Sequence, residues 1–447
     1  MKIINSYRFR IYPAPEQEEV LFKTIGCARK TYNLTLDFYQ NLYSSYKNGD
    51  IDKKEHNRVK KSLNPSAFKP EYPYLAEVDS TALKYAKKHC DTAYKNFFDG
   101  RAQFPNFKKR NASKWSYTTC RAGKGAKNVR LERGGWLVLP KVKGRVRVTV
   151  HRNPKGTLVS ATVTKERSGK WFVSLGYEQH IPNPVKAVSI NNPVGLDMGI
   201  KDLAVSSDGT VFPNLKHAYR EKKRIARIDR KLSRQRERAK REGLRLSECS
   251  NYQKTKKKRA RLYEKVKNRR EDYLHKVTSS IVKNHDFVAV ESLSSTNLMK
   301  NHNLAYAISD TSWSTFSTFL DYKGEKYSCI IQYIDRFYAS TQLCSVCGEK
   351  AGPCGMDELD VRKWTCDFCG SFHHRDENAA INILIKGLVE YLSVTTTGTV
   401  GGEDVKHLLS LVNNNLLGLS SQEKFGGQEL SVADDCRSHH FNFPSGK

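Results

Sequence analysis

The chain has 447 residues, 38% of them apolar, so it can bury more than one hydrophobic core. Its 77 Lys and Arg residues against 46 Asp and Glu residues give a formal charge of +31, which indicates a polyanionic partner. Nucleic acid is the first expectation and an anionic membrane surface the second. The sequence lacks both a run of roughly 18 apolar residues and an apolar signal-peptide core, which argues against a membrane-spanning or secreted protein. We therefore expect a cytoplasmic protein, nucleoid-associated in a prokaryote or nuclear in a eukaryote.

The first part of the chain predicts a strand followed by helices. The segment SYRFRIYP alternates like a short strand, and residues 14–46 have helical periodicity with Pro15 near the start. Asp79 is placed to cap a second helix that Gly100 ends. Thr81, Lys84 and Lys88 fall on the polar face of that helix.

The middle of the chain changes in texture. Short β-branched runs separated by Gly, Asn and Pro occupy about 110–190 and predict an antiparallel sheet or a small barrel. Residues 192–212 predict two further strands, the second ending in an Asp-Gly turn. Residues 216–270 contain 24 Lys and Arg residues against 6 Asp and Glu residues, with apolar residues at helical spacing. We predict a basic helical hairpin broken at 243–250; such a run is commonly a solvated face, but this one suits contact with phosphates.

The remaining segments predict a mixed α/β sheet and a tail. Residues 273–293 and 312–335 each have the pattern of a helix that leads into a strand. Residues 391–447 are rich in Gly, Ser and Asn and less basic than the rest, which predicts a flexible tail.

Four of the eleven cysteines form two C-x-x-C pairs with metal-ligand spacing. They are Cys344, Cys347, Cys366 and Cys369, and a glycine follows each pair. Two unrelated reduced pairs are the alternative, but four thiolates at this spacing predict a structural zinc ribbon, since a catalytic zinc keeps an open position. Because no cysteine ligand is missing, we predict that His373 and His374 are surface or backbone-facing groups near nucleic acid.

Three acidic residues stand where an ionised side chain is unfavourable. Asp197 lies in PVGLDMGI, Glu291 ends FVAVE, and Asp376 precedes NAAINILIKGL. Singly they could be a turn former, a strand-end surface acid and a helix N-cap. Together, Asp on a first strand, Glu on a later one and Asp at a final helix are typical of a ribonuclease-H-like core whose carboxylates hold two Mg²⁺ ions. The order favours RuvC-type nucleases over DDE transposases, by analogy of fold.

Over nearly all of residues 1–390 the chain resembles the TnpB (OrfB) family of insertion-sequence proteins, which is related to compact type V CRISPR effectors. The motifs that carry the resemblance are FRIYPAPEQEEVLFKTIGCARKTYN, GLDMGIKDLAVSSDG, NRREDYLHKVTSSIV, VAVESL, SDTSWSTF, STQLCSVCG, WTCDFCG and HHRDENAAINI, in the family's order. Met198 beside Asp197 leaves the acid in place.

The resemblance implies an RNA-guided DNA endonuclease with a multidomain α+β fold. A guide RNA from the transposon end would pair with a double-stranded DNA target beside a short target-adjacent motif, with no membrane partner. Residues 1–13 and 111–190 would form a β-barrel wedge domain, and 14–110 an inserted helical recognition domain. Residues 191–342 and 372–390 would form the RuvC-like nuclease domain, with the basic hairpin at 216–284 and the zinc ribbon at 343–371.

The resemblance also assigns residues. Asp197, Glu291 and Asp376 would be the catalytic acids that hold Mg²⁺, and the four cysteines would hold Zn²⁺. The helix after Asp79 lies where the family reads duplex DNA, which makes Thr81, Lys84 and Lys88 candidate DNA contacts; a solvated polar face is the alternative reading.

Three other functions fit the same motifs. A compact type V CRISPR effector would share them, and a CRISPR array beside the gene would distinguish it. An RNA-guided DNA-binding regulator without nuclease activity is less favoured because all three acids are present. A guide-independent nuclease would cut branched DNA without RNA.

Overall fold

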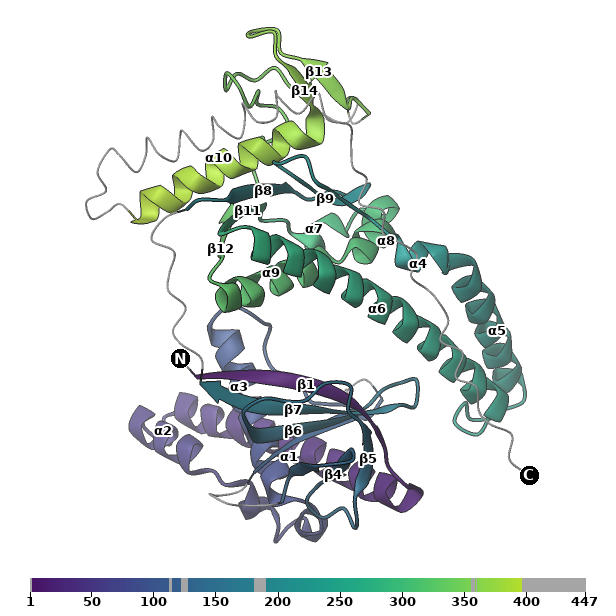
Figure 1. The fold of residues 1–447 in the computed structure, drawn as a ribbon. Helices are drawn as coiled ribbons and strands as arrows, with labels where there is room; N and C mark the ends of the chain where they lie inside the picture. Colours follow the sequence, from purple (N-terminus) through teal and green to yellow (C-terminus); the bar gives the residue numbers. More distant parts are fainter. Residues whose placement is uncertain are drawn as a thin grey trace. The chain divides into compact units, whose positions relative to one another are not determined.

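A computed structural model describes residues 2–111, 115–121, 128–180, 190–354, 358 and 360–395, drawn in Figure 1. These residues fall into two units. The first comprises Met1–Asn183 and Lys223–Lys265, and the second comprises Pro184–Lys222 and Val266–Lys447. Each unit has its own sheet and its own hydrophobic core.

The first unit is built on a seven-stranded antiparallel sheet with the order β2-β6-β7-β1-β5-β4-β3. Its strands are β1 (Lys2–Tyr12), β2 (Trp115–Cys120), β3 (Arg130–Glu132), β4 (Trp136–Val138), β5 (Val146–Thr149), β6 (Thr157–Lys165) and β7 (Trp171–His180). Strand β1 is central because it pairs with both β7 and β5, so the N-terminal segment is bonded to strands far along the chain. Among the described residues no ladder joins β2 to β3, and closure into a barrel stays a prediction.

Two long helices of the first unit begin as the sequence predicts. Helix α1 (Pro15–Asn48) has proline at its first position, and helix α3 (Ser80–Phe98) is capped by Asp79, whose carboxylate accepts a hydrogen bond from the amide of Thr81. The buried side chains of α1 recur every three or four residues and join α3 in one core. Between them lie helix α2 (Lys53–Ser62) and two 3₁₀ turns, Pro65–Phe68 and Pro73–Ala76.

The basic segment is helical, as predicted. Helix α5 (Lys222–Arg241) and helix α6 (Ser250–Asn284) are separated by a turn in which Gly243 has a φ of +65°. The buried residues of α5 are Ile225, Leu232 and Ala239, at seven-residue intervals. Arg259 on α6 donates to Asp229 on α5 at 2.5 Å. The apolar stripe is therefore covered while most Lys and Arg side chains stay exposed.

The second unit contains a five-stranded sheet with the order β10-β9-β8-β11-β12. Its strands are β8 (Pro193–Asp197), β9 (Asp202–Ser206), β10 (Val211–Pro213), β11 (Phe287–Glu291) and β12 (Ile330–Ile334). Strands β8, β11 and β12 are parallel, while β9 and β10 extend the sheet in antiparallel fashion. The carboxyl ends of three strands therefore meet at one edge, where ligands bind in open α/β sheets.

Helices cover both faces of this sheet (Figure 1). On β11, Val288 and Val290 pack with helix α9 (Trp313–Tyr327), while Phe287 and Ala289 pack under helix α10 (Arg375–Thr395). Burial on both faces explains the nearly uninterrupted apolar runs of β8 and β11. The unit also contains helices α4 (His217–Arg220), α7 (Ser295–Leu298) and α8 (His302–Thr311), and the strands β13 (Lys363–Thr365) and β14 (Phe372–His374).

The contact of α10 with the sheet depends on Gly195. A Cβ atom at this position would lie 2.1 Å from the carbonyl oxygen of Ala380 and 2.8 Å from Cβ of Leu384. Glycine therefore lets the helix backbone touch β8 two residues before Asp197, which sets the height of α10 above the strand end.

Changing Gly195 to alanine should lower the free energy of unfolding by about 1–3 kcal/mol, because backbone must move to admit a methyl group. Gly26 offers a matched control, since it lies within α1 and a Cβ there meets nothing within 4 Å. Gly26→Ala should instead stabilise by about 0.5–1 kcal/mol through helix propensity. Urea unfolding of both variants would contradict this account if the two changes had the same sign.

The predicted flexible tail, 391–447, begins inside a helix. Helix α10 continues to Thr395, five residues beyond residue 390, after which the tail is predicted to begin. The remainder of the predicted tail, 396–447, lies outside the described residues. Among the helices described, none combines the length and apolar character needed to cross a membrane.

Candidate functional site

Two of the predicted acids end adjacent parallel strands. Asp197 is the last residue of β8 and Glu291 is the last residue of β11, and the residues just before them, Leu196 and Val290, are partners in the ladder. The strand pairing therefore brings the two side chains to the same edge of the sheet. Local sequence alone could not predict this proximity, because the two acids lie 94 positions apart in the chain.

The third acid reaches this edge on α10. Asp376 lies inside the first turn of the helix rather than ahead of it, so the N-cap interpretation is wrong for this residue. An acid in the first turn complements the positive end of the helix dipole. The contact at Gly195 carries α10 across β8, so that Asp376 comes close enough for its charge to act on Asp197.

The electrostatics of the three acids are unfavourable without a cation. Burial raises the pKa of Asp197 well above its usual range, and the charges of Glu291 and Asp376 raise it further. Burial also raises the pKa of Glu291, against the effect of a 2.8 Å hydrogen bond that Ser340 Oγ donates to Glu291 Oε1. Arg362 lies 3.3 Å from Asp376 and offsets part of the negative charge. Oxygen ligands and excess negative charge suit a hard cation such as Mg²⁺.

Removing one of these charges should stabilise the metal-free protein. A carboxyl whose pKa is higher in the folded state binds protons more strongly there, so stability falls as pH rises from the unfolded pKa near 4 through the raised value. Asp197→Asn removes this dependence. In magnesium-free buffer, urea unfolding should show a stability gain for the variant that grows with pH over this window. A stability gain that does not change with pH would contradict a raised pKa of Asp197 in the folded protein.

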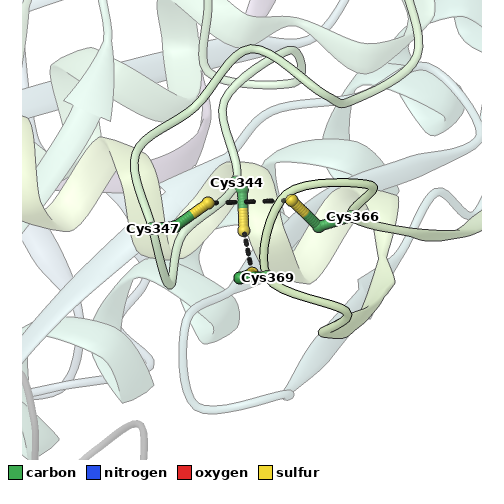
Figure 2. A group of neighbouring side chains, drawn as sticks. All are labelled: Cys344, Cys347, Cys366 and Cys369. Atoms are coloured by element: carbon green, nitrogen blue, oxygen red, sulfur yellow. Dashed lines mark hydrogen bonds between the residues drawn. The ribbon is translucent and has the colours of Figure 1, made fainter.

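A second cluster is formed by thiols in the segment between β12 and α10 (Figure 2). The Sγ atoms of Cys344, Cys347, Cys366 and Cys369 all lie within 4.8 Å of one another, and this is the one group of three or more potential ligands so gathered among the described residues. The distances are 3.6 Å between Cys344 and Cys369 and 3.7 Å between Cys347 and Cys366. The four donors can hold a metal ion, and an all-sulfur set fits zinc.

Each cysteine pair lies on a tight turn closed by a glycine amide. Gly348 donates to the carbonyl of Cys344 and Gly370 to that of Cys366, and both glycines have positive φ angles of +81° and +72°. A hydrogen bond from Ser371 lowers the pKa of Cys369 to about 6, which favours the thiolate that a metal requires.

The two histidines after the cysteines differ, and the prediction of surface or backbone-facing groups is wrong for His373, whose buried ring faces a thiol. In β14 His374 is exposed, but His373 is buried with its Nε2 atom 3.1 Å from Sγ of Cys344. Its ring also packs on Trp364, at 4.6 Å between centroids. A ring nitrogen at this distance can donate to a metal-bound thiolate. The alternation of β14 separates the two residues and could have been seen in the sequence.

Two buried asparagines of α10 join the thiol cluster to the acids. Asn378 accepts from the amide of Ser345 at 2.9 Å and donates to the carbonyl of Leu343 at 2.7 Å. Asn382 donates to the carbonyls of Leu343 and Ser340, at 2.7 and 2.8 Å. The hydroxyl of Ser340 also bonds Glu291 at the end of β11. The face of α10 that bears the two asparagines therefore positions both this strand end and the turn that begins at Cys344. The i, i+4 spacing of these asparagines in an apolar helix is the signal that could have found them.

Comparisons with known proteins identify the family. A family model described as "Probable transposase" matches residues 174–302, one described as "Cas12f1-like, TNB domain" matches 313–383, and one described as "Helix-turn-helix domain" matches 1–48. A Streptomyces pristinaespiralis protein named "Putative RNA-guided DNA endonuclease" is 34% identical over 87% of this chain and 90% of that protein. An Escherichia coli K12 protein named "Putative RNA-guided DNA endonuclease InsQ" is 30% identical over 87% of this chain and 93% of its own length. The chain belongs to the OrfB (TnpB) family.

The fold agrees with this membership. The structure titled "Cryo-EM structure of the Cas12f1-sgRNA-target DNA complex" superposes with a TM-score of 0.54, covering 86% of this chain and 98% of that one at 12% identity. This likeness shows a shared mixed α+β multidomain fold. The match to the Cas12f1-like model runs from α9 through the cysteine cluster into α10, so this part of the OrfB chain contains the thiols and Asp376.

The three candidate DNA contacts on α3 differ in exposure. Lys84 and Lys88 are exposed, and Lys88 lies 5.4 Å above the ring of Tyr85. The hydroxyl of Thr81 is bonded inward, to the carboxylate of Asp79 and to the hydroxyl of Thr119, both at 2.6 Å. The two lysines are therefore available to a phosphate, while the hydroxyl of Thr81 is occupied by its bonds to Thr119 and to Asp79, the residue that caps α3.

Proposed function

We propose that this OrfB-family chain is an RNA-guided DNA endonuclease of a transposable element that cuts double-stranded DNA beside a short target-adjacent motif. The observation that carries the proposal is the convergence of Asp197, Glu291 and Asp376 at the carboxyl edge of a parallel sheet, where the charges of the other two acids raise the pKa of Asp197. The names of the Streptomyces and Escherichia coli relatives support the same activity. The excess of positive charge supports nucleic-acid partners.

In this proposal the three carboxylates hold two Mg²⁺ ions in a RuvC-like site. The ions, when bound, would activate a water molecule and stabilise the leaving oxygen of the phosphodiester. Ser340 orients Glu291, and Arg362 holds Asp376 until a cation replaces it.

The four cysteines would hold a structural Zn²⁺ that fixes the segment between β12 and α10. A thiolate set leaves no open position for water, so the zinc would take no part in hydrolysis. Residues 1–13 and 111–190 would serve as the wedge domain, 14–110 as the recognition domain and 191–342 with 372–390 as the nuclease domain. Lys84 and Lys88 are the stronger candidates for contact with target DNA.

Sequencing the RNA that copurifies with the protein tests the proposal. We expect one abundant transcript from the end of an insertion sequence, and a DNA duplex that matches its guide segment should be cut in the presence of Mg²⁺. Random cellular RNA, or cutting of branched DNA without any RNA, would overturn the guided mechanism.

A further inference from the structure

The loop that leaves β12 presents an aromatic side chain to solvent. Phe337 is 79% exposed, the largest exposed fraction among the large apolar side chains described. The guanidinium group of Arg336 lies 4.6 Å from the centroid of its ring. A single exposed apolar side chain is ordinary on a protein surface. A cation stacked beside an exposed ring is a more specific arrangement, because both groups can contact the face of a nucleobase.

The backbone on both sides of Phe337 is held in place. The carboxylate of Asp335 accepts from the amide of Phe337 at 2.7 Å, and the amide of Tyr338 donates to the carbonyl of Asp335 at 3.2 Å. Three residues after the ring, Asn382 bonds the carbonyl of Ser340. The exposed ring therefore projects from a loop whose position is fixed, which lowers the entropy lost when a flat ligand stacks on it.

The same loop holds one of the acids. Ser340, whose hydroxyl bonds Glu291, lies three residues beyond Phe337. A polar groove of about 530 Å³ adjoins this strand end and is lined by Ser292, Ser294, Asp335 and Arg336, among others. A strand that places a phosphate at the carboxylates would pass next to the ring.

We propose that Phe337 and Arg336 form a stacking platform for a base of the DNA strand that enters the carboxylate site. The inference rests on the proposed function and deepens it, since it names a substrate contact beyond the acids. The platform binds the flat face of any base and so favours no sequence. It requires a base that is unpaired at the time of cutting, because a base within a duplex has no free face.

Fluorescence of 2-aminopurine tests the contact directly, because stacking quenches this base analogue. The protein, purified with its own RNA and carrying Asp197→Ala to keep the DNA intact, is mixed with a matching duplex. The analogue is placed at successive positions around the cut site in each strand. We expect one or two adjacent DNA positions to be quenched, Phe337→Ala to restore their fluorescence, and Phe337→Trp to keep them quenched.

Cleavage rates of Phe337 variants that retain Asp197 show whether the aromatic ring acts by stacking on a base or only by filling space. Phe337→Ala and Phe337→Leu should each lower kcat/KM about tenfold, while Phe337→Tyr should stay within about twofold. A leucine variant as active as wild type, or quenching that appears only with the analogue in the RNA, would overturn the inference. If wild type cuts and no Phe337 variant differs, only the inference fails. If wild type does not cut the matching duplex, the proposed function fails and the inference with it.

Discussion

Replacing Asp197 by alanine should abolish DNA cleavage while leaving RNA and target binding nearly unchanged. The side chain would ligate the metal rather than the phosphates that dominate affinity for nucleic acid. Loss of several kcal/mol of transition-state stabilisation corresponds to a rate lower by about a thousandfold or more. Single-turnover cleavage of a matched duplex measures the rate, and gel-shift titration with the same duplex measures binding.

Asp272 supplies the matched control for this change. It is an exposed acid of α6 that pairs with Lys276 on the helix surface at 2.9 Å. Asp272→Ala should therefore cut at close to the wild-type rate, since an exposed pair of this kind contributes little. Undiminished cleavage by the Asp197 variant would remove the carboxylate edge from the mechanism.

Replacing Cys366 by serine should prevent zinc binding by the thiol cluster and destabilise the segment between β12 and α10. Structural zinc contributes about 10 kcal/mol or more of apparent binding free energy in small zinc-binding peptides, and that binding is coupled to folding. We expect the zinc content to fall from one ion per chain and the melting temperature to drop. Cleavage should fall as well, because the cysteine turn and Ser340 are held by the same helix face.

Cys354 is the control for the zinc prediction. It lies in the same segment but is exposed and is not one of the four clustered thiols. Cys354→Ser should keep the zinc, the melting temperature and the activity. Elemental analysis of both variants decides the point: full zinc occupancy in Cys366→Ser would contradict the ligand assignment.

The sequence was sufficient where one short segment contains the whole signal. The two C-x-x-C pairs predict the thiol cluster because a tight turn brings the members of each pair together, and the strands before Asp197 and Glu291 are evident from their apolar runs. The cap at Asp79 is local in the same way. In each case the pattern that makes the prediction is contained in a few consecutive residues, although the two cysteine pairs meet across 25 positions, from Cys344 to Cys369.

The sequence was insufficient where the contact joins distant segments. Ser340 holds Glu291 across 49 positions, and His373 reaches Cys344 across 29. Neither residue type is unusual at its place in the sequence, so only the packing of α10 and β14 reveals its role. The pairing of Arg362 with Asp376 is similar, because the arginine comes from the cysteine segment and the acid from the helix.

The hydrogen bonds of Asn378 and Asn382 limit how this chain can be recombined with its relatives. The two side-chain amides bond the backbone at Ser340, Leu343 and Ser345, so a helix α10 taken from a relative without asparagines at these positions would leave those backbone groups without these partners. Any donor segment supplies the backbone groups, so the asparagines are the part that a chimera has to keep. A junction placed before residue 340 would also need a serine or another donor there to bond Glu291.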